Sequence, residues 1–207
     1  MFSEQKNMKT GIVILAGGKG TRYGKKKQNE LFHGKTLLKR VYDKAKSVCE
    51  NVVVVGENVP AGDTRSFSVI NGLKALPTDT EMVVLLEAAR PLVTCEQIRN
   101  ILFDNYPSKS YVQPLVNTII GRNGTFFDRD KMYELLVPQS FDYQLLIDAY
   151  SSGKFTDMTD ETRVMYEYYQ IKPKLIETEQ NLFKVTYPND LAVLESLYQR
   201  LKKNLDD

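Results

Sequence analysis

Three features of the sequence predict a three-layer α/β fold with a mostly parallel sheet and a short protruding β-arm. Short apolar runs rich in β-branched residues alternate with longer segments of helical period, which is typical of a parallel sheet covered by helices. A glycine-rich turn, residues 15–24, directly follows the first apolar run. The dipeptide Asn123-Gly124 is a strong hairpin signal and lies inside a short excursion, residues 117–127.

The first half of the chain predicts strands and helices in alternation. Leu37, Leu38, Val41 and Ala45 recur at helical spacing and form one apolar face. The four consecutive valines at 52–55 predict a buried strand. The expected elements are strand 12–15, helix 36–48, strand 52–55, helix 64–76 and strand 82–86.

The second half predicts further strands and helices around the excursion. Thr94 and Gln97 have the spacing of a capping box, so a helix is expected after Thr94. The remaining expected elements are strand 111–116, helices 142–152 and 159–169, strands 173–177 and 182–186, and a C-terminal helix beginning at Pro188. That last helix carries a leucine stripe at positions 191, 194, 197, 201 and 205.

Length, charge and cysteine content bound the class of protein. The 207 residues suit a single domain spanning 1–207. The 28 basic and 26 acidic residues leave a net charge of +2, so we expect no nucleic-acid or membrane partner. Residues 1–10 are polar and no apolar run approaches about 18 residues, which predicts a cytoplasmic protein. Cys49 and Cys95 are expected to be buried free thiols, and His33 is the only histidine, which excludes multi-histidine sites.

The glycine-rich turn, LAGGKGTRYG, is the most informative segment of the chain. Gly17, Gly18 and Gly20 let the backbone turn tightly and bring N–H groups against a phosphate. Thr21, Arg22 and the lysines at 25–27 supply a hydroxyl donor and positive charge where a triphosphate would lie. The spacing matches neither the dinucleotide fingerprint nor the P-loop. The segment therefore predicts a different kind of nucleoside triphosphate site.

Three more polar segments lie at expected strand ends or helix starts, where open α/β sheets bind ligands. They are residues 62–69, 87–91 and 181–186. Arg65 and Ser68 are one helical turn apart in the first segment, and Glu87 and Arg90 follow the third strand. Lys184 lies in an apolar run, where a lysine is otherwise typical of a strand edge with its ammonium in water. A carboxylate after a strand is likewise common as a helix cap, so each segment alone also has a purely structural explanation.

The segments together resemble the cytidylyltransferases that act on polyol phosphates, namely on 2-C-methyl-D-erythritol 4-phosphate or D-ribitol 5-phosphate. The motifs LAGGKGTRYG, TRSFSVINGL, EAARP, FFDRDKMY, VPQSF, TDET and KVTYPNDL occur in the family's order and approximate spacing, over about residues 11–195. The resemblance implies a three-layer, Rossmann-like nucleotidyltransferase fold. It also implies that CTP and a small phosphorylated polyol are the substrates, Mg²⁺ the cofactor, and a homodimer joined through the 117–127 arm the assembly.

The resemblance further implies a role for each matching residue. Catalytic roles fall on Arg22, Lys27 and Lys184, and nucleotide binding on Ala16, Gly17, Gly18, Gly20, Thr21, Arg65, Ser68, Ala88 and Arg90. Acceptor binding falls on Asn117, Thr118, Arg129, Thr159 and Asp160, and Glu87 takes the place of the metal ligand. Arg129 matches an arginine that reaches the acceptor phosphate of the neighbouring subunit in the family's dimers.

These residue types suit the reaction that the family performs. An acceptor phosphate oxygen attacks the α-phosphorus of CTP in line, and pyrophosphate leaves. The enzyme has to hold two polyanions together and neutralise the developing charge, which cations and a metal do without a covalent nucleophile.

Three departures from the family pattern bear on function. Glu87 replaces the family's metal-binding aspartate, and Leu86 replaces the histidine that usually precedes it. Asn117 stands before Thr118 where the family has an acidic residue. The loop 56–62 and the arm 117–127 are short for the family, which bears on the dimer and on Arg129.

The sequence therefore predicts a CTP-dependent cytidylyltransferase with a ribitol 5-phosphate-like acceptor, a precursor of the cell envelope or capsule. LAGGKGTRYG and PQSF favour the ribitol-phosphate enzymes, whereas AARP favours the alternative, the 2-C-methyl-D-erythritol 4-phosphate enzymes of isoprenoid synthesis. A second alternative is a sugar-1-phosphate nucleotidylyltransferase, against which TRSFSVINGL and KVTYPNDL argue. The third is a non-catalytic nucleotide-binding paralogue. Glu87 and Asn117 favour it, and the retained Arg22, Lys27, Arg90 and Lys184 oppose it.

Overall fold

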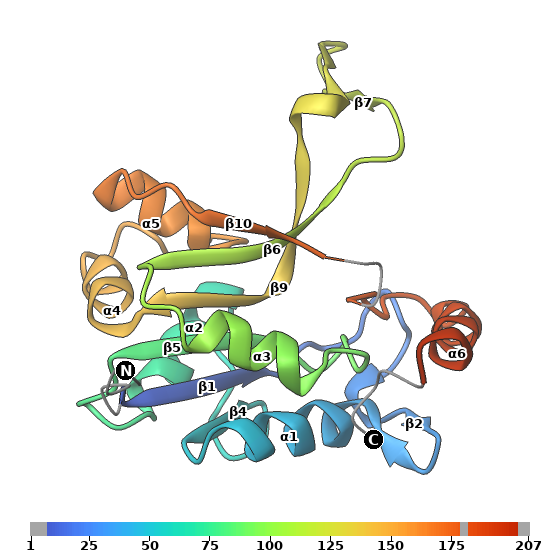
Figure 1. Cartoon of the computed structure of the whole chain (residues 1–207), viewed down its shortest axis with the longest axis horizontal. Coiled ribbons are helices and arrows are strands. Elements are labelled where there is room, and N and C mark those ends of the chain that lie inside the picture. The colour runs from blue at the N-terminus through green and yellow to red at the C-terminus, as the bar shows by residue number, and fades with distance from the viewer. Residues whose placement is uncertain (1–7, 179–181, 203–207) are drawn as a thin grey trace, which may run out of the picture.

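A six-stranded sheet forms the centre of the computed structural model, which describes residues 8–178 and 182–202 (Figure 1). The strand order is β10-β6-β9-β5-β1-β4. The strands are β1 (Thr10–Leu15), β4 (Val52–Val55), β5 (Met82–Glu87), β6 (Ser108–Pro114), β9 (Tyr133–Asp142) and β10 (Lys174–Glu177). All neighbouring strands pair in parallel except β9, which is antiparallel to both β5 and β6.

Helices cover both faces of the sheet, so the predicted three-layer α/β class is confirmed (Figure 1). One face packs against α1 (Leu37–Val48) and α3 (Cys95–Leu102). The other face packs against α2 (Arg65–Lys74), α4 (Tyr143–Ser151) and α5 (Glu161–Tyr169). Burial on both faces explains why the central strand β1 has a continuous apolar run rather than an alternating pattern. In the part of the chain that the structure describes, no helix is long and apolar enough to cross a membrane.

Side-chain caps fix where the five packed helices begin. Thr36, Thr64, Thr94, Asp142 and Asp160 each precede a helix and accept a hydrogen bond from a backbone N–H of its first turn. These bonds satisfy donors that have no partner within the helix. The predicted capping box of Thr94 and Gln97 is present. The expected helices therefore form within a few residues of their predicted bounds.

Strand β9 has no counterpart among the sequence predictions. Pro138 lies inside it, and a proline argues against a central strand because it cannot donate a ladder hydrogen bond. The structure accommodates the proline at a bulge. The register shifts between Ser110 and Tyr111 on β6, opposite Gln139 and Leu136 on β9, so that Val137 and Pro138 fall between paired positions.

The strand predicted at 182–186 is wrong. These residues form an extended segment without a ladder, although single bonds tie the segment to the loop after β5. Val185 N donates to Ala89 O at 2.9 Å, and the Arg90 guanidinium donates to Leu182 O. Leu182 and Val185 are buried. The apolar residues that suggest a strand thus pack into the core and hold this segment against the loop after β5. The strand predicted at 111–116 is also displaced, because β6 begins at Ser108 and ends at Pro114.

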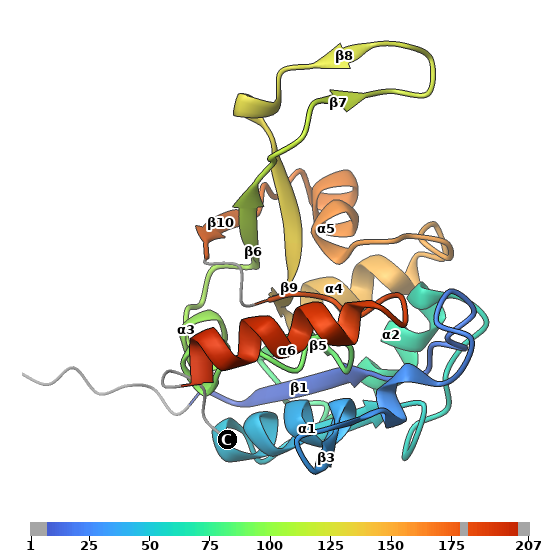
Figure 2. The same cartoon turned by 90° about the vertical axis from the view of Figure 1, so that its right-hand side faces the viewer.

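The predicted excursion forms an arm that projects from the sheet (Figure 2). Its tip is a hairpin of β7 (Ile119–Ile120) and β8 (Phe126–Phe127), and Gly124 has the left-handed φ of +84° in the turn between them. The arm then returns through a short 3₁₀ turn, Arg129–Lys131, into β9. Ile120 and Phe126 are exposed at 55% and 71%, an amount of apolar surface that is typical of a contact region.

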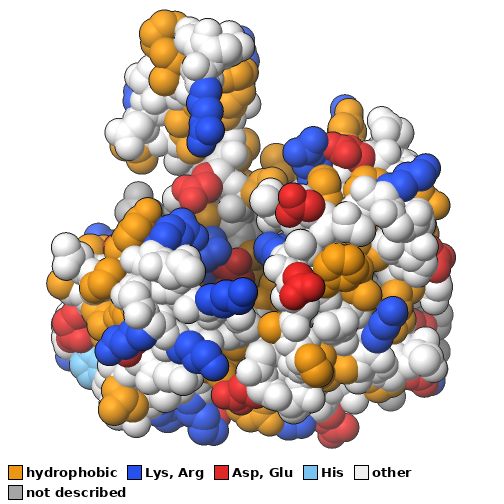
Figure 3. All heavy atoms as spheres, turned by 180° about the vertical axis from the view of Figure 1, so that it is seen from behind, with side chains coloured by type: hydrophobic (Ala, Val, Ile, Leu, Met, Phe, Trp, Pro, Cys, Tyr) orange, Lys and Arg blue, Asp and Glu red, His pale blue; other side chains and the backbone are white. Residues whose placement is uncertain are grey.

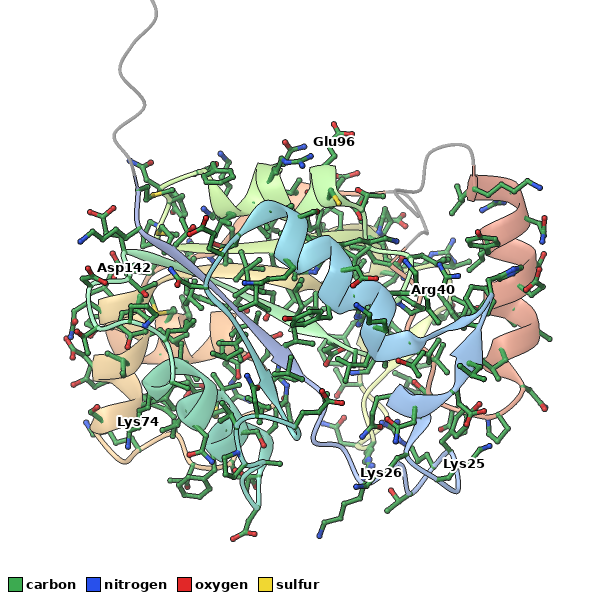
Figure 4. The ribbon with its side chains drawn as sticks, turned by 90° about the horizontal axis from the view of Figure 1, so that it is seen from below. Lys25, Lys26, Arg40, Lys74, Glu96 and Asp142 are labelled. Carbon is green, nitrogen blue, oxygen red and sulfur yellow. The ribbon has the colours of Figure 1, made fainter. Side chains whose placement is uncertain are left out.

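The C-terminal helix α6 (Asp190–Leu201) packs at one end of the molecule, against a small hairpin of β2 (Leu31–Phe32) and β3 (Lys35–Thr36). Arg40 joins the two, because its guanidinium lies over the rings of Phe32 and Tyr198 and its Nε donates to Phe32 O at 2.8 Å (Figure 4). Leu194 of the predicted leucine stripe is buried here. Leu205 lies outside the described residues. Cys49 and Cys95 are buried free thiols, as predicted.

Lys109 on β6 is a charged residue buried in the core. Its side chain is fully buried, and its Nζ lies 3.8 Å from Asp104 Oδ1 without a hydrogen-bond partner among the described residues. Burial lowers the pKa of Lys109 from 10.5 to about 8, although Asp104 opposes the shift. The unfolded chain therefore binds more protons between pH 8 and 10.5, so the penalty for burying Lys109 is full below pH 8 and disappears above 10.5.

We expect Lys109→Met to raise the free energy of unfolding at pH 7 by about 1–3 kcal/mol, because it removes a poorly paired buried charge. Asp104 keeps its ion pair with Lys174. Urea unfolding of both proteins at pH 7 and pH 10 measures the effect. The gain should shrink at the higher pH, and an equal gain at both would mean that charge burial is not its cause.

Candidate active site

A cavity of about 420 Å³ opens at the carboxyl ends of β1 and β5. Its lining residues are Leu15, Ala16, Gly17, Gly18, Lys19, Arg22, Lys27, Gln28, Gly62, Asp63, Thr64, Arg65, Ser68, Glu87, Ala88, Ala89 and Lys184. Figure 3 shows a hollow beneath the arm, with Lys and Arg side chains gathered around it. The cavity thus joins the four polar segments that the sequence places at strand ends and helix starts.

The glycine turn forms the floor of the cavity. Gly20 has a φ of +69°, and a Cβ there would lie 1.8 Å from Lys25 O, so a side chain is excluded. Gly20 O accepts bonds from the N–H groups of Tyr23 and Gly24, which close the turn. A Cβ on Gly18 would meet no atom within 4 Å, so the Gly18 backbone faces open space. The turn therefore leaves room for a ligand to approach the main chain closely.

Lys27 and Gln28 connect the turn to the rest of the site. Lys27 Nζ donates to Val185 O at 2.6 Å, and Gln28 Nε2 donates to Ala16 O at 2.7 Å. Burial and the nearby charges of Lys184 and Arg22 lower the pKa of Lys27, against the opposing effect of Glu87. Cations that repel one another in a cavity are stabilised when an anion enters, so this end of the site is suited to a phosphate chain.

Glu87 forms a network with two cations. Its Oε1 accepts from Lys184 Nζ at 2.8 Å, and its Oε2 pairs with Arg90 Nε at 3.2 Å. Burial alone raises the pKa of a carboxyl, but the charges of Lys184 and Arg90 outweigh it and lower the pKa of Glu87 to about 2. Glu87 is therefore ionised at neutral pH, and its side chain is 12% exposed.

The first turn of α2 forms another wall. Ser68 Oγ donates to Thr64 O at 3.1 Å and accepts from Gly62 N at 3.0 Å, which fixes the loop that enters the helix. A Cβ on Gly62 would lie 2.3 Å from Phe67 Cβ, so glycine is required for this close approach. Arg65 begins the helix and pairs with Glu161 of α5. The wall combines N-terminal helix backbone with a guanidinium and a hydroxyl.

The structure brings most of the predicted catalytic, nucleotide and metal residues to this cavity. Those lining it are Ala16, Gly17, Gly18, Arg22, Lys27, Arg65, Ser68, Glu87, Ala88 and Lys184. Gly20 and Thr21 lie in the turn without lining the cavity, and Arg90 lies behind Glu87 as its partner. The individual roles of these residues stay predictions.

The predicted acceptor residues do not line the cavity. Asn117, Thr118 and Arg129 are exposed on the arm, where the Arg129 guanidinium donates to Val116 O of the same arm. Thr159 is exposed, and Asp160 caps α5 while accepting from Gln139 Nε2 at 2.7 Å. Within one chain, the structure therefore leaves the acceptor set apart from the phosphate-binding set.

Two carboxylates in the cavity lining are of the type that would hold a divalent metal. Mg²⁺ is commonly held by one or two carboxylates together with substrate phosphates and water. Glu87 is an ionised carboxylate that lines the cavity, and Asp63 lies in the same lining. The described residues contain no group of three acidic, histidine or cysteine side chains suited to a metal. An ion here would therefore depend on the phosphates of a nucleotide for much of its coordination.

Several residues that line the cavity or support its lining were missing from the sequence prediction. Gln28 had a usable signal, because it follows Lys27 in the family-like segment. Asp63 and Thr64 lie in the predicted 62–69 turn but were given no role. Glu161, the buried partner of Arg65, follows Thr159 and Asp160 in the TDET segment. An acidic residue in a polar stretch gives no sequence signal of burial, so this partner required the structure.

Comparisons with known proteins show the family of the chain. A family model described as 2-C-methyl-D-erythritol 4-phosphate cytidylyltransferase matches residues 10–200. The enzyme of that name from Alkaliphilus oremlandii is 28% identical over 91% of this chain and 94% of its own length. The D-ribitol-5-phosphate cytidylyltransferase of Rattus norvegicus is 27% identical over 89% of this chain, which spans 51% of the rat protein.

Solved structures support the fold. The 4-diphosphocytidyl-2C-methyl-D-erythritol synthase of Anaerococcus prevotii superposes with a TM-score of 0.78 at 21% identity, over 93% of this chain and 99% of that one. The 2-C-methyl-D-erythritol 4-phosphate cytidylyltransferase of Thermus thermophilus gives 0.77 at 24% identity, over 93% and 100%. Since the family model spans nearly the whole chain, the protein belongs to the polyol-phosphate cytidylyltransferase family and is a nucleotidyltransferase enzyme.

Proposed function

We propose that this enzyme transfers CMP from CTP to the phosphate of 2-C-methyl-D-erythritol 4-phosphate and releases pyrophosphate. The observation that carries the reaction type is the meeting of the glycine turn, Lys27, Lys184 and Glu87 in one cavity. The family model and the relative from Alkaliphilus oremlandii favour this acceptor over the ribitol 5-phosphate expected from the sequence motifs.

The geometry suggests how the residues divide the work. Lys27 and Lys184 come from opposite ends of the chain and sit at one cavity with Arg22, so they would surround the phosphates of CTP. A fixed cation neutralises charge that develops on the phosphates as the α–β bond breaks. Glu87 would hold Mg²⁺, which when bound supplies further charge neutralisation and orients the phosphates. No residue has to act as a covalent nucleophile.

The test is pyrophosphate release with CTP, Mg²⁺ and a panel of acceptors. We expect turnover with 2-C-methyl-D-erythritol 4-phosphate. We also expect CTP to exceed UTP and ATP by about tenfold or more in kcat/KM, because hydrogen bonds would read the donors and acceptors on the edge of the base, which differ between cytosine, uracil and adenine. Ribitol 5-phosphate and a sugar 1-phosphate complete the panel. Higher kcat/KM with ribitol 5-phosphate would overturn the choice of acceptor, and equal use of UTP would overturn the choice of nucleotide.

Ribitol 5-phosphate remains the second candidate acceptor, for a specific reason. Asn117 replaces the acidic residue that the family carries before its threonine, so the arm has one negative charge fewer near the expected acceptor site. The rat relative also acts, by its name, on D-ribitol 5-phosphate. The acceptor panel separates the two directly.

We also propose that two copies associate through the arm. Ile120, Phe126 and Phe127 are exposed on it, and Arg129 does not reach the cavity of its own chain. A neighbouring copy would cover this apolar surface and receive Arg129 near its cavity. Sedimentation of the protein and of a Phe126→Ser variant tests the association, and a wild type that remains monomeric at assay concentrations would overturn it.

A further inference from the structure

The described residues contain a buried ion pair that the reaction chemistry does not require. The Arg65 guanidinium pairs with Oε1 of Glu161, and Tyr150 Oη donates to the same oxygen at 2.9 Å. Glu161 is 0% exposed, whereas Arg65 is 25% exposed and lines the cavity. A fully buried carboxylate is costly, so its retention next to a cavity residue requires an explanation.

Arg65 and Tyr150 both contact the same one of the two oxygens of Glu161. Its Oε2 is buried without a hydrogen-bond partner among the described residues. Burial opposes the charge of Arg65, but Glu161 outweighs burial and raises the pKa of Arg65. The pKa of Tyr150 is raised as well, by burial and then by Glu161, so its hydroxyl stays a donor. One guanidinium and one phenol are therefore the partners of this buried carboxylate.

The same region is joined by two further contacts. Thr64 Oγ1 donates to Thr156 O at 2.7 Å. Ser66 Oγ donates to Met158 O at 3.2 Å and accepts from Met158 N at 2.9 Å. Together with the Arg65–Glu161 pair, residues 64–66 thus bind the segment that leads into α5 and the first residue of that helix. Side-chain hydrogen bonds therefore tie this wall of the cavity to the segment before α5.

The ion pair with Glu161 changes how Arg65 can interact with a ligand. A guanidinium whose charge is neutralised by a buried carboxylate contributes little net attraction for phosphate, but its remaining N–H groups stay fixed in a plane. Lys19, Arg22 and Lys27 also line the cavity, and they come from the glycine turn and the residues just beyond it. Arg65 instead shares its wall with Gly62, Thr64 and Ser68. The residue types suit phosphate recognition by the glycine turn and base recognition by the start of α2.

We propose that Glu161 and Tyr150 are positioning residues that hold the Arg65 guanidinium in the orientation that selects cytosine over uracil. The inference rests on the proposed cytidylyl transfer. Cytosine presents two adjacent acceptors, O2 and N3, whereas uracil has a donor at N3. A planar pair of N–H donors held in place accepts the first arrangement and rejects the second. A mobile guanidinium rotates away and loses this discrimination.

Two variants test the proposal, each with a matched control. Glu161→Gln removes the charge and Tyr150→Phe removes only the hydroxyl donor. Glu167→Gln changes an exposed Glu on the same helix that pairs with Arg163. Tyr143→Phe removes a buried hydroxyl on α4 that donates to Leu73 O, away from the cavity. The controls therefore report the cost of losing an ion pair or a buried hydroxyl as such.

We expect Glu161→Gln and Tyr150→Phe to raise KM for CTP about three- to tenfold and to lower the CTP-over-UTP ratio of kcat/KM by a similar factor. The KM for the acceptor and the kcat with saturating CTP should change less than about twofold, as should every value for the controls. Arg65→Lys keeps the charge without the planar fork and should lose the same discrimination.

The outcomes separate this inference from the proposed function. Calorimetric affinities for CTP and UTP are measured on every variant, so the ratio is available even if no acceptor in the panel reacts. Absence of turnover in a wild type that binds CTP would contradict the proposed function alone. An unchanged CTP-over-UTP ratio in folded Tyr150→Phe would overturn the inference, even if Glu161→Gln fails to fold. A lowered melting temperature with an unchanged ratio would show a merely structural role.

Discussion

Replacing Lys184 by alanine is expected to lower the turnover of CTP about a hundredfold or more, because a fixed cation at developing phosphate charge contributes roughly 3–4 kcal/mol to the transition state. Lys184 does not lie on a strand edge. Its segment is tethered by Val185 to Ala89, and its Nζ reaches Glu87 Oε1 at 2.8 Å at the cavity. Steady-state rates at saturating CTP measure the effect, and circular dichroism checks the fold.

Lys27→Ala should have an effect of the same order, for the same reason. Lys26 provides the matched control: it is the neighbouring residue, it is exposed, and it lies at the outer edge of the loop (Figure 4). Lys26→Ala should retain the turnover of the wild type within about twofold, since an exposed charge outside the cavity is screened by water. A near-normal rate for Lys184→Ala or Lys27→Ala would assign that lysine a structural role only.

The sequence predicts the parts of the fold that depend on local pattern. Strands such as β4 and helices such as α3 carry a continuous apolar run or a capping box, and they form where expected. Strand β9 could not be predicted, because Pro138 disfavours a strand unless a bulge accommodates it, and the bulge depends on pairing with β6. The strand prediction for 182–186 is wrong for the opposite reason. The apolar residues of this segment have the composition of a strand, but they pack into the core and hold the segment against the loop after β5.

The candidate site also has features that the sequence predicts and features that it does not. Glycines and lysines at fixed offsets are legible in the sequence, because the chemistry of phosphate binding restricts which residue types serve there. The sequence does not show which charged residues pair with one another. The Glu87–Arg90 pair is local, but nothing in the sequence indicates that Glu161 lies buried against Arg65 or that Lys184 reaches Glu87. Such pairs form between residues 96 and 97 positions apart, and tertiary packing alone decides them.

Glu87→Gln is expected to abolish metal-dependent turnover. The pKa of Glu87 is lowered to about 2, so the substitution removes a full negative charge at any pH used for assay. A neutral amide is a poor ligand for Mg²⁺, and two cations would face the metal position without a carboxylate between them. The same substitution leaves Lys184 and Arg90 without their shared charged partner, so a loss of stability of about 1–3 kcal/mol is expected as well, the cost of leaving hydrogen-bonding groups poorly paired. Activity alone therefore does not separate a metal ligand from a structural ion pair.

A metal titration on the folded variants makes that separation. If Glu87 is a ligand, Glu87→Asp keeps the charge, stays active and shifts its preference toward Mn²⁺, which tolerates looser geometry than Mg²⁺ when the carboxylate is withdrawn by one methylene. Glu87→Gln should then show no activity at any metal concentration. If Glu87 only joins Lys184 to Arg90, Glu87→Gln loses stability but retains the metal dependence of the wild type. Unfolding in urea identifies conditions in which both variants are folded, so that a change in the metal curve reports coordination rather than loss of the fold.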